Sequence, residues 1–166
     1  MFRKVKISGL TVDPFTNTPI VILKDLEEKN AVPIWIGILE ASAIVTELEK
    51  IQLPRPMTHD LLKNVFSTLN INVVKIEIND LKESTFYATL HLHMNGKNYA
   101  IDSRPSDAIA IALRTDSPIY ISDDVIEKSR KIDLKEGSVA KTDKESEKWA
   151  EILANLSPED FGKYKM

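Results

Sequence analysis

Residues 102–114 read D-S-R-P-S-D-A-I-A-I-A-L-R. The first six of them carry two carboxylates, two hydroxyls and an arginine, whereas the others are mostly small or aliphatic. This change of composition predicts that a strand ends here and that a helix of small residues begins. Polar groups at such a junction often bind ligands or catalyse reactions. The same residues also suit an ordinary capped helix start.

Strand patterns and amphipathic helix patterns alternate on both sides of this stretch. Alternating or short apolar runs predict strands over 4–12, 20–23, 31–36, 72–78, 85–93, 97–101 and 119–121. Apolar residues at helical spacing predict helices over 39–51, from the turn at 58–60 to 69, over 108–113 and from 122–124 to about 131. Asn95-Gly96 predicts a tight hairpin, so the sheet is expected to be antiparallel at least locally. Pro33 suits an edge strand or a strand start.

The two halves of the chain repeat one plan. At a shift of 65 residues, the strand at 34–36 falls on 99–101, and the helix at 43–44 falls on 108–109. This predicts an α+β fold with a duplicated β-β-β-α unit (about 4–69 and 72–131), in which helices pack on one or two largely antiparallel sheets. The same register lays 37–40 on 102–105, so the polar cluster belongs to one copy. That asymmetry favours a function at the second strand-to-helix junction, residues 102–105, over the first, residues 37–40.

Length and composition predict one compact domain at residues 1–132. A chain of 166 residues, of which 43% are hydrophobic and 28% charged, can build one good core. No apolar run is long enough to cross a membrane, and residues 1–7 lead straight into a strand pattern, so we expect a cytoplasmic protein without a membrane partner. Residues 133–166 are expected to form a charged linker and then an amphipathic helix or tail around Trp149, Ile152, Leu153 and Leu156.

The cysteine count and the net charge narrow the chemistry. The chain has no cysteine, which excludes a disulfide framework, a thiolate nucleophile and a cysteine-bound zinc ion. A metal would need carboxylate or histidine ligands, which favours hard ions such as Mg²⁺ or Mn²⁺. The net charge of -3 argues against a broad, nonspecific nucleic-acid surface, while a local basic face stays open.

Four runs of sequence resemble one known family. They are P-R-P-M-T-H-D at 54–60, D-S-R-P-S-D-A-I-A-I-A-L-R at 102–114, S-P-I-Y-I at 117–121 and L-S-P-E-D-F at 156–161. Together they are similar to the bifunctional nuclease domain family, and the chain resembles its stand-alone bacterial members. The resemblance implies nuclease activity on both DNA and RNA, with nucleic acid as the partner. It brings no established set of catalytic residues.

The candidate site residues therefore follow from chemistry. A metal-dependent phosphodiesterase needs carboxylates that converge on Mg²⁺ or Mn²⁺, a group that activates water and a cation that holds the phosphate. The candidate metal ligands are Asp102, Asp107 and Glu40. The candidate catalytic residues are Asp102, Asp107, Asp60 and His59. The candidate phosphate-binding residues are Arg104, Arg55, Ser103 and Ser106. These candidate residues share one cleft only if the fold brings the strand-to-helix junctions of the two halves together.

Each candidate also has a structural interpretation. Asp102 or Ser103 can cap the helix, and Asp107 suits its first turn, where the helix dipole favours a carboxylate. Arg104 can form an ion pair with either acid. The run at 58–60 is also a plausible helix cap.

Two pairs of side chains lie outside these runs. His91 and His93 share a strand face, which would suit metal chelation, but no carboxylate is evident as a third ligand. A surface or cross-strand role is therefore expected for both. Trp35 and Trp149 are expected in the core or at an interface.

The competing function is noncatalytic. An acidic, duplicated domain without a basic stripe is compatible with a binding or regulatory module that recognises a small anion or a protein partner. Such a module, like the nuclease, is expected to form a homo-oligomer through its sheet edges. A third alternative is that the polar junction holds the two halves together. Cleavage assays with and without divalent metal distinguish the enzyme from the other two.

Overall fold

Seven strands and four helices make up the described part of the chain, for which a computed structural model gives the backbone of residues 1–136 and the side chains of residues 1–130. The strands are β1 (Phe2–Val12), β2 (Pro19–Asp25), β3 (Ala31–Trp35), β4 (Asn72–Lys82), β5 (Thr85–Met94), β6 (Lys97–Ser103) and β7 (Ile119–Ser122). The helices are α1 (Ile38–Leu48), α2 (Thr58–Thr68), α3 (Pro105–Thr115) and α4 (Asp123–Glu136).

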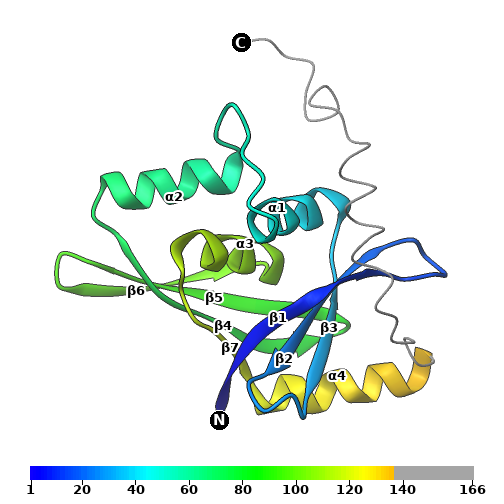
Figure 1. The fold of residues 1–166 in the computed structure, drawn as a ribbon. Coiled ribbons are helices and arrows are strands. Elements are labelled where there is room, and N and C mark those ends of the chain that lie inside the picture. The colour runs from blue at the N-terminus through cyan, green and yellow to red at the C-terminus, as the bar shows by residue number, and fades with distance from the viewer. Residues whose placement is uncertain (137–166) are drawn as a thin grey trace.

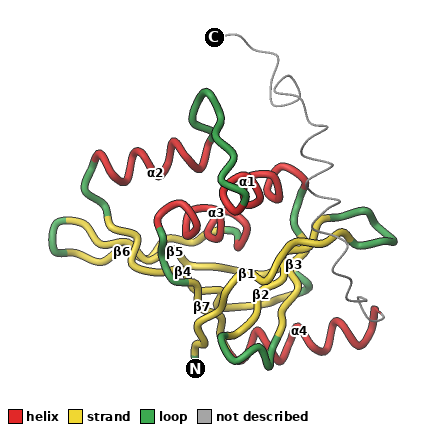
Figure 2. Tube along the Cα trace, in the orientation of Figure 1, coloured by secondary structure: helices red, strands yellow, loops and turns green. Residues whose placement is uncertain are grey.

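The described strands form one sheet in the order β3-β2-β1-β7-β4-β5-β6. Each half contributes three consecutive antiparallel strands, and β7 joins the halves by pairing antiparallel to β1 and parallel to β4. α1, α2 and α3 lie on one side of this twisted sheet and α4 lies on the other (Figures 1 and 2). The α+β class and the mostly antiparallel sheet are thus confirmed. Pro33 does lie on an edge strand, β3.

α3 is the central helix of the layer above the sheet. It contacts α1 and α2 on its flanks, and β4 and β5 below. Residues 108–112, A-I-A-I-A, are all buried, because the alanines allow neighbouring backbones to approach closely while the isoleucines fill the core. The residues that precede this buried run are thereby fixed at the place where α1, α2 and the sheet meet.

The two halves share an element order, but no single shift relates them. α1 begins at Ile38 and α3 at Pro105, which is a shift of 67, whereas β1 and β4 begin 70 residues apart. The shifts differ because the loops differ in length. Residues 13–18 connect β1 to β2, whereas only residues 83–84 connect β4 to β5. The register of 65 therefore does not hold at the helices, where Glu40 is the counterpart of Asp107. A duplication origin stays a prediction.

The predicted cap of α3 is wrong. β6 continues through Ser103, so Asp102 lies within the strand and Arg104 takes the N-cap position. Arg104 makes no side-chain cap, and the Ser103 hydroxyl donates to the carbonyl oxygen of Arg104 (3.0 Å) instead of reaching into the helix. The first N–H groups of α3 are consequently left without a capping side chain.

The other predicted caps are closer to the structure. In α2 the Asp60 carboxylate accepts a hydrogen bond from the backbone N–H of Met57 (2.9 Å), the residue that precedes the helix. In α4 the Ser122 hydroxyl accepts from the backbone N–H of Val125 (3.2 Å). α4 thus has a side-chain acceptor for one of its first N–H groups, whereas in α2 the Asp60 carboxylate bonds the N–H of the preceding residue.

The C-terminal predictions fall largely beyond the structure. α4 continues to Glu136, past the predicted end near residue 131. The predicted amphipathic segment around Trp149 lies outside the described residues. Among the described helices, none has the length and apolar character needed to span a membrane.

Candidate functional site

Three carboxylates occupy the same place in three neighbouring helices. Glu40, Asp60 and Asp107 are each the third residue of α1, α2 and α3 respectively. Carboxylates are favoured there because the first turn of a helix carries partial positive charge. Since α3 contacts both α1 and α2, the helix starts can share side-chain partners.

Arg104 connects the first of these helices to the third. Its Nε and Nη2 donate to the two oxygens of Asp107 (2.7 and 3.1 Å), and its Nη1 donates to Glu40 Oε1 (2.8 Å). A guanidinium has five N–H donors; within the described part of the chain three are used and two have no partner. The Arg104 side chain is 64% exposed, so the free donors face solvent. Two carboxylates thus hold the guanidinium fork in a fixed orientation.

His59 joins this cluster from α2. Its Nε2 lies 2.9 Å from Asp107 Oδ1, although the two residues are 48 positions apart in the sequence. The His59 side chain is 16% exposed and that of Asp107 is 29% exposed. We call Glu40, His59, Arg104 and Asp107 the junction cluster. It contains one residue from each of α1 and α2, with the other two at the start of α3.

The electrostatics of the junction cluster keep the Asp107 carboxylate ionised. Partial burial raises the pKa of Asp107, but the hydrogen bonds and charges of Arg104 and His59 outweigh burial and leave the pKa below its usual value. In return, Asp107 and then Glu40 raise the pKa of Arg104. Asp107 is therefore an acceptor that can fix the ring of His59 at neutral pH.

The third carboxylate has a different partner. Asp60 Oδ1 accepts from Nε of Arg114 (2.6 Å), whose side chain is only 3% exposed. Arg114 also donates from Nη1 to the carbonyl oxygen of Ala110 (3.0 Å). Asp60 thus neutralises a buried arginine between α2 and α3, a contact that sequence reasoning missed. The available signal was a lone arginine in the last turn of an otherwise apolar helix.

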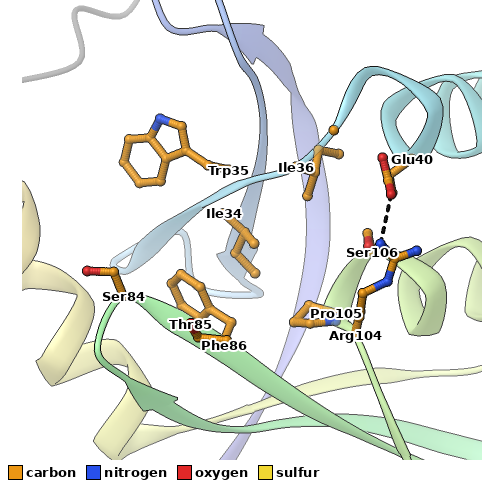
Figure 3. A pocket seen from close by; sticks show the side chains of 11 residues that line it. Ile34, Trp35, Ile36, Glu40, Ser84, Thr85, Phe86, Arg104, Pro105 and Ser106 are labelled. Carbon is orange, nitrogen blue, oxygen red and sulfur yellow. Dashed lines mark hydrogen bonds and ion pairs between the residues drawn. The ribbon is translucent and has the colours of Figure 1, made fainter. Parts of the chain in front are cut away.

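A pocket of about 270 Å³ opens beside the junction cluster. Its lining includes both charged residues that bridge the helices, Glu40 and Arg104, together with a mostly apolar wall. The wall residues are Ile34, Trp35, Ile36, Phe86 and Pro105. Figure 3 shows Trp35 and Phe86 on one side of the pocket, with Glu40, Ser106 and Arg104 on the other.

Comparison with known proteins assigns the chain to a family. Residues 21–133, more than half of the chain, match the family described as the bifunctional nuclease domain. The chain belongs to the bifunctional nuclease domain family. Its similarity to uncharacterised proteins from two strains of Mycobacterium tuberculosis is 36% identity over 162 residues, which cover 95% of this chain and 97% of theirs.

A plant relative carries a functional name. Bifunctional nuclease 1 of Oryza sativa subsp. japonica is 27% identical over 107 residues, which cover 61% of this chain and 32% of the rice protein. The family membership predicted from the sequence runs is thus confirmed.

Three predicted site residues of this bifunctional nuclease domain lie apart from the junction cluster. Asp102 lies on β6 and pairs with Thr89 of β5, and because successive strand residues face opposite ways, it lies on the other face of the sheet from Ser103. Neither Asp102 nor Arg55 makes a side-chain hydrogen bond or ion pair within the described part of the chain, and both are exposed. Ser103 is half-buried and bonds only the backbone.

The bifunctional nuclease domain also contains a histidine pair away from the cluster. His91 Nε2 lies 2.7 Å from Glu77 Oε2 on β4, and His93 Nδ1 lies 2.7 Å from Asn98 Oδ1 on β6. The expected cross-strand role is confirmed. Glu77, 9% exposed, is the carboxylate that the sequence did not reveal, because strand pairing and not sequence distance places it beside His91.

Proposed function

We propose that the protein is a nuclease that hydrolyses phosphodiester bonds of RNA or DNA at the junction cluster. The observation that carries the proposal is the Arg104 guanidinium, which is held by two carboxylates and keeps two N–H donors free next to a histidine–carboxylate pair. Family membership and the rice relative named a bifunctional nuclease support the same class of reaction.

Arg104 has the role of phosphate clamp in this proposal. Its free donors can bond two oxygens of one phosphate, which positions the ester and stabilises the negative charge of the transition state. Glu40 and Asp107 are positioning residues, because they hold the fork without using the donors that face the substrate.

His59 has the role of proton-transfer group. The contact with the Asp107 carboxylate favours the tautomer with the proton on Nε2, which leaves the lone pair on Nδ1. Within the described part, Nδ1 makes no hydrogen bond, so it can take a proton from water or from a ribose hydroxyl. Asp107 stabilises the imidazolium that results.

A requirement for Mg²⁺ or Mn²⁺ stays a prediction. In the described residues no three His, Asp or Glu side chains converge as metal ligands, and Arg104 already bonds both Glu40 and Asp107. The residues therefore do not fit a preformed ion site, and no step is assigned to an ion. The candidate ligand Asp102 would have to come from the other face of the sheet.

A cleavage assay tests the proposal. Single-stranded RNA and DNA are incubated with the purified protein in Mg²⁺, in Mn²⁺ or in EDTA. We expect His59→Gln to lower the cleavage rate by about 10²-fold or more, the usual contribution of a general acid or base. Arg104→Lys is expected to lower it about tenfold, because lysine keeps the charge but loses the fork. His93→Gln, which changes a histidine outside the cluster, serves as the matched control.

The outcomes separate the alternatives. Cleavage that persists unchanged in folded His59→Gln and Arg104→Lys proteins would place the activity elsewhere. Absence of cleavage in all three buffers would favour the noncatalytic binding or regulatory module. Full activity in EDTA would overturn the metal requirement alone.

The expected homo-oligomer and cytoplasmic location also remain proposals. Besides the sheet edges expected from the sequence, Leu61 and Val65 of α2 and Leu69 just after it are exposed at a spacing of four residues, and their burial by a second copy would remove apolar surface from water. Sedimentation of the wild type beside Val65→Glu tests this stripe, since a charge there should weaken association.

A further inference from the structure

The start of α3 presents unused hydrogen-bond donors to the pocket. Ser106 lines the pocket and is 7% exposed, yet its hydroxyl has no partner within the described part of the chain. The backbone N–H groups of Ser106 and Asp107 also lack an acceptor there, because the residue at the N-cap offers no side-chain cap. A buried hydroxyl without a partner is unfavourable, so this arrangement indicates a ligand with acceptor oxygens.

The hydrogen-bond donors at this end of the pocket can bind an anion. A helix N-terminus favours negative charge, and Arg104 adds two free donors on the same side of the pocket. Arg104 bonds both oxygens of Asp107 and Oε1 of Glu40, so Glu40 Oε2 remains an acceptor beside the donors of Ser106 and Arg104 that have no partner within the described part of the chain. A phosphate supplies the acceptors that Ser106 and Arg104 lack.

The opposite side of the pocket selects a flat apolar group. Phe86 and Trp35 are half-buried lining residues, and the Trp35 indole N–H is fixed by a hydrogen bond to Asp13 Oδ2 (3.0 Å). Fixed aromatic side chains are typical platforms for unpaired bases. The volume of about 270 Å³ lies just below the range of about 300–1,000 Å³ that is usual for small-molecule sites, so one small unit fits.

We propose that this pocket binds one unpaired nucleotide of a single-stranded nucleic acid, with its phosphate at Ser106 and Arg104 and its base against Phe86 and Trp35. The identity of the ligand rests on the proposed nuclease function. A paired base is stacked within a duplex and cannot enter, so the pocket makes the protein selective for single strands.

Nucleotide binding is measured without cleavage. The full chain with Trp149→Phe keeps Trp35 as its single tryptophan, and its fluorescence is titrated with uridine 5′-monophosphate, uridine or inorganic phosphate. We expect saturable quenching by the nucleotide, with about tenfold weaker binding of uridine and of phosphate, because each lacks one half of the contact. Single-stranded oligouridylate should displace the nucleotide, whereas a duplex of equal length should not.

Two substitutions locate the ligand. Ser106→Ala and Phe86→Leu should each weaken nucleotide binding about tenfold, the latter through lost stacking. Ser67→Ala, on the exposed side of α2, is the matched control and should leave binding unchanged. The thermal midpoint of the free protein should not fall in Ser106→Ala, since the hydroxyl has no protein partner to lose. A fall would indicate a structural role and overturn the assignment.

The nucleotide pocket and the nuclease activity can fail independently of each other. Cleavage without saturable quenching of Trp35 would overturn the nucleotide pocket and leave the nuclease intact. Specific nucleotide binding without cleavage would overturn the nuclease and leave the pocket intact. Phosphate that binds as tightly as the nucleotide, or variants that bind like the control, would also overturn the pocket.

Discussion

Glu40 bends back over Gly37 to reach Arg104, so a single methyl group at residue 37 can disturb the junction cluster. A Cβ there would lie 2.1 Å from Glu40 Oε2, although the backbone of Gly37 (φ -74, ψ 165) is open to any residue. A side chain at residue 37 would thus meet the Glu40 carboxylate, whereas the backbone conformation accepts any residue. The clash is with the end of a flexible side chain, which can move away at low cost.

We expect Gly37→Ala to displace the Glu40 carboxylate from Arg104. Arg104 is largely exposed, so the lost pair should lower the free energy of unfolding by no more than about 1 kcal/mol. Urea unfolding of Gly37→Ala, Glu40→Ala and the double variant measures it. The part of the loss that involves Glu40 should vanish in the Glu40→Ala background. An identical loss in both backgrounds would show that helix capping alone is affected.

Two polar contacts connect α2 to α3, namely His59 with Asp107 and Asp60 with Arg114. Phe66 is the one buried residue of α2, whereas Asp60 meets the buried Arg114 of α3. Burial raises the pKa of Asp60, but hydrogen bonds from Arg114 and from the Met57 backbone outweigh it and leave the pKa lowered.

Asp60→Ala should destabilise the protein by about 3 kcal/mol, the lower end for breaking a buried ion pair, because Asp60 itself is 31% exposed. The loss arises because the Arg114 guanidinium stays buried without its partner. Asp60→Asn, which keeps an acceptor for Arg114 and for the helix start, should cost less. Equal urea midpoints for Asp60→Ala and the wild type would contradict this role of the pair.

Several ion-paired carboxylates among the described residues have pKa values below their usual range. Hydrogen bonds from Lys82 and then Lys128 lower the pKa of Asp80 to about 2, which links the end of β4 to α4. Asp107, Asp60 and Glu77 are also lowered. In each case the folded state binds protons less readily than the unfolded chain, so folding is favoured while these groups are ionised.

The free energy of unfolding should therefore stay level from neutral pH to about 4, the usual carboxylate value, and fall as the pH drops further through the folded pKa values. For Asp80 the loss should continue to about pH 2. Urea midpoints measured between pH 2 and 7 test this. The Asp80→Asn protein should lose less stability than the wild type as the pH falls from about 4 to about 2. Stability that rises on acidification would contradict the assigned pairs.

The sequence by itself determined the type and order of the elements, the family, and the composition of the polar junction. These properties are local, because strand alternation, helical spacing and hairpin turns depend on residues near one another. It also placed Arg104 and Asp107 together, since they lie one helical turn apart. It did not determine the cap of α3, because β6 extends two residues further than its apolar pattern suggested.

Tertiary structure alone decided which distant residues join that junction. Glu40 is 64 positions from Arg104, and His59 is 48 positions from Asp107. Both contacts exist because the alanines of α3 let α1 and α2 pack beside it, with the three helix starts within reach of one another. The pleat of β6 places Asp102 on the other face of the sheet from Ser103. This separation was not predicted from the sequence, because the strand was expected to end before Asp102.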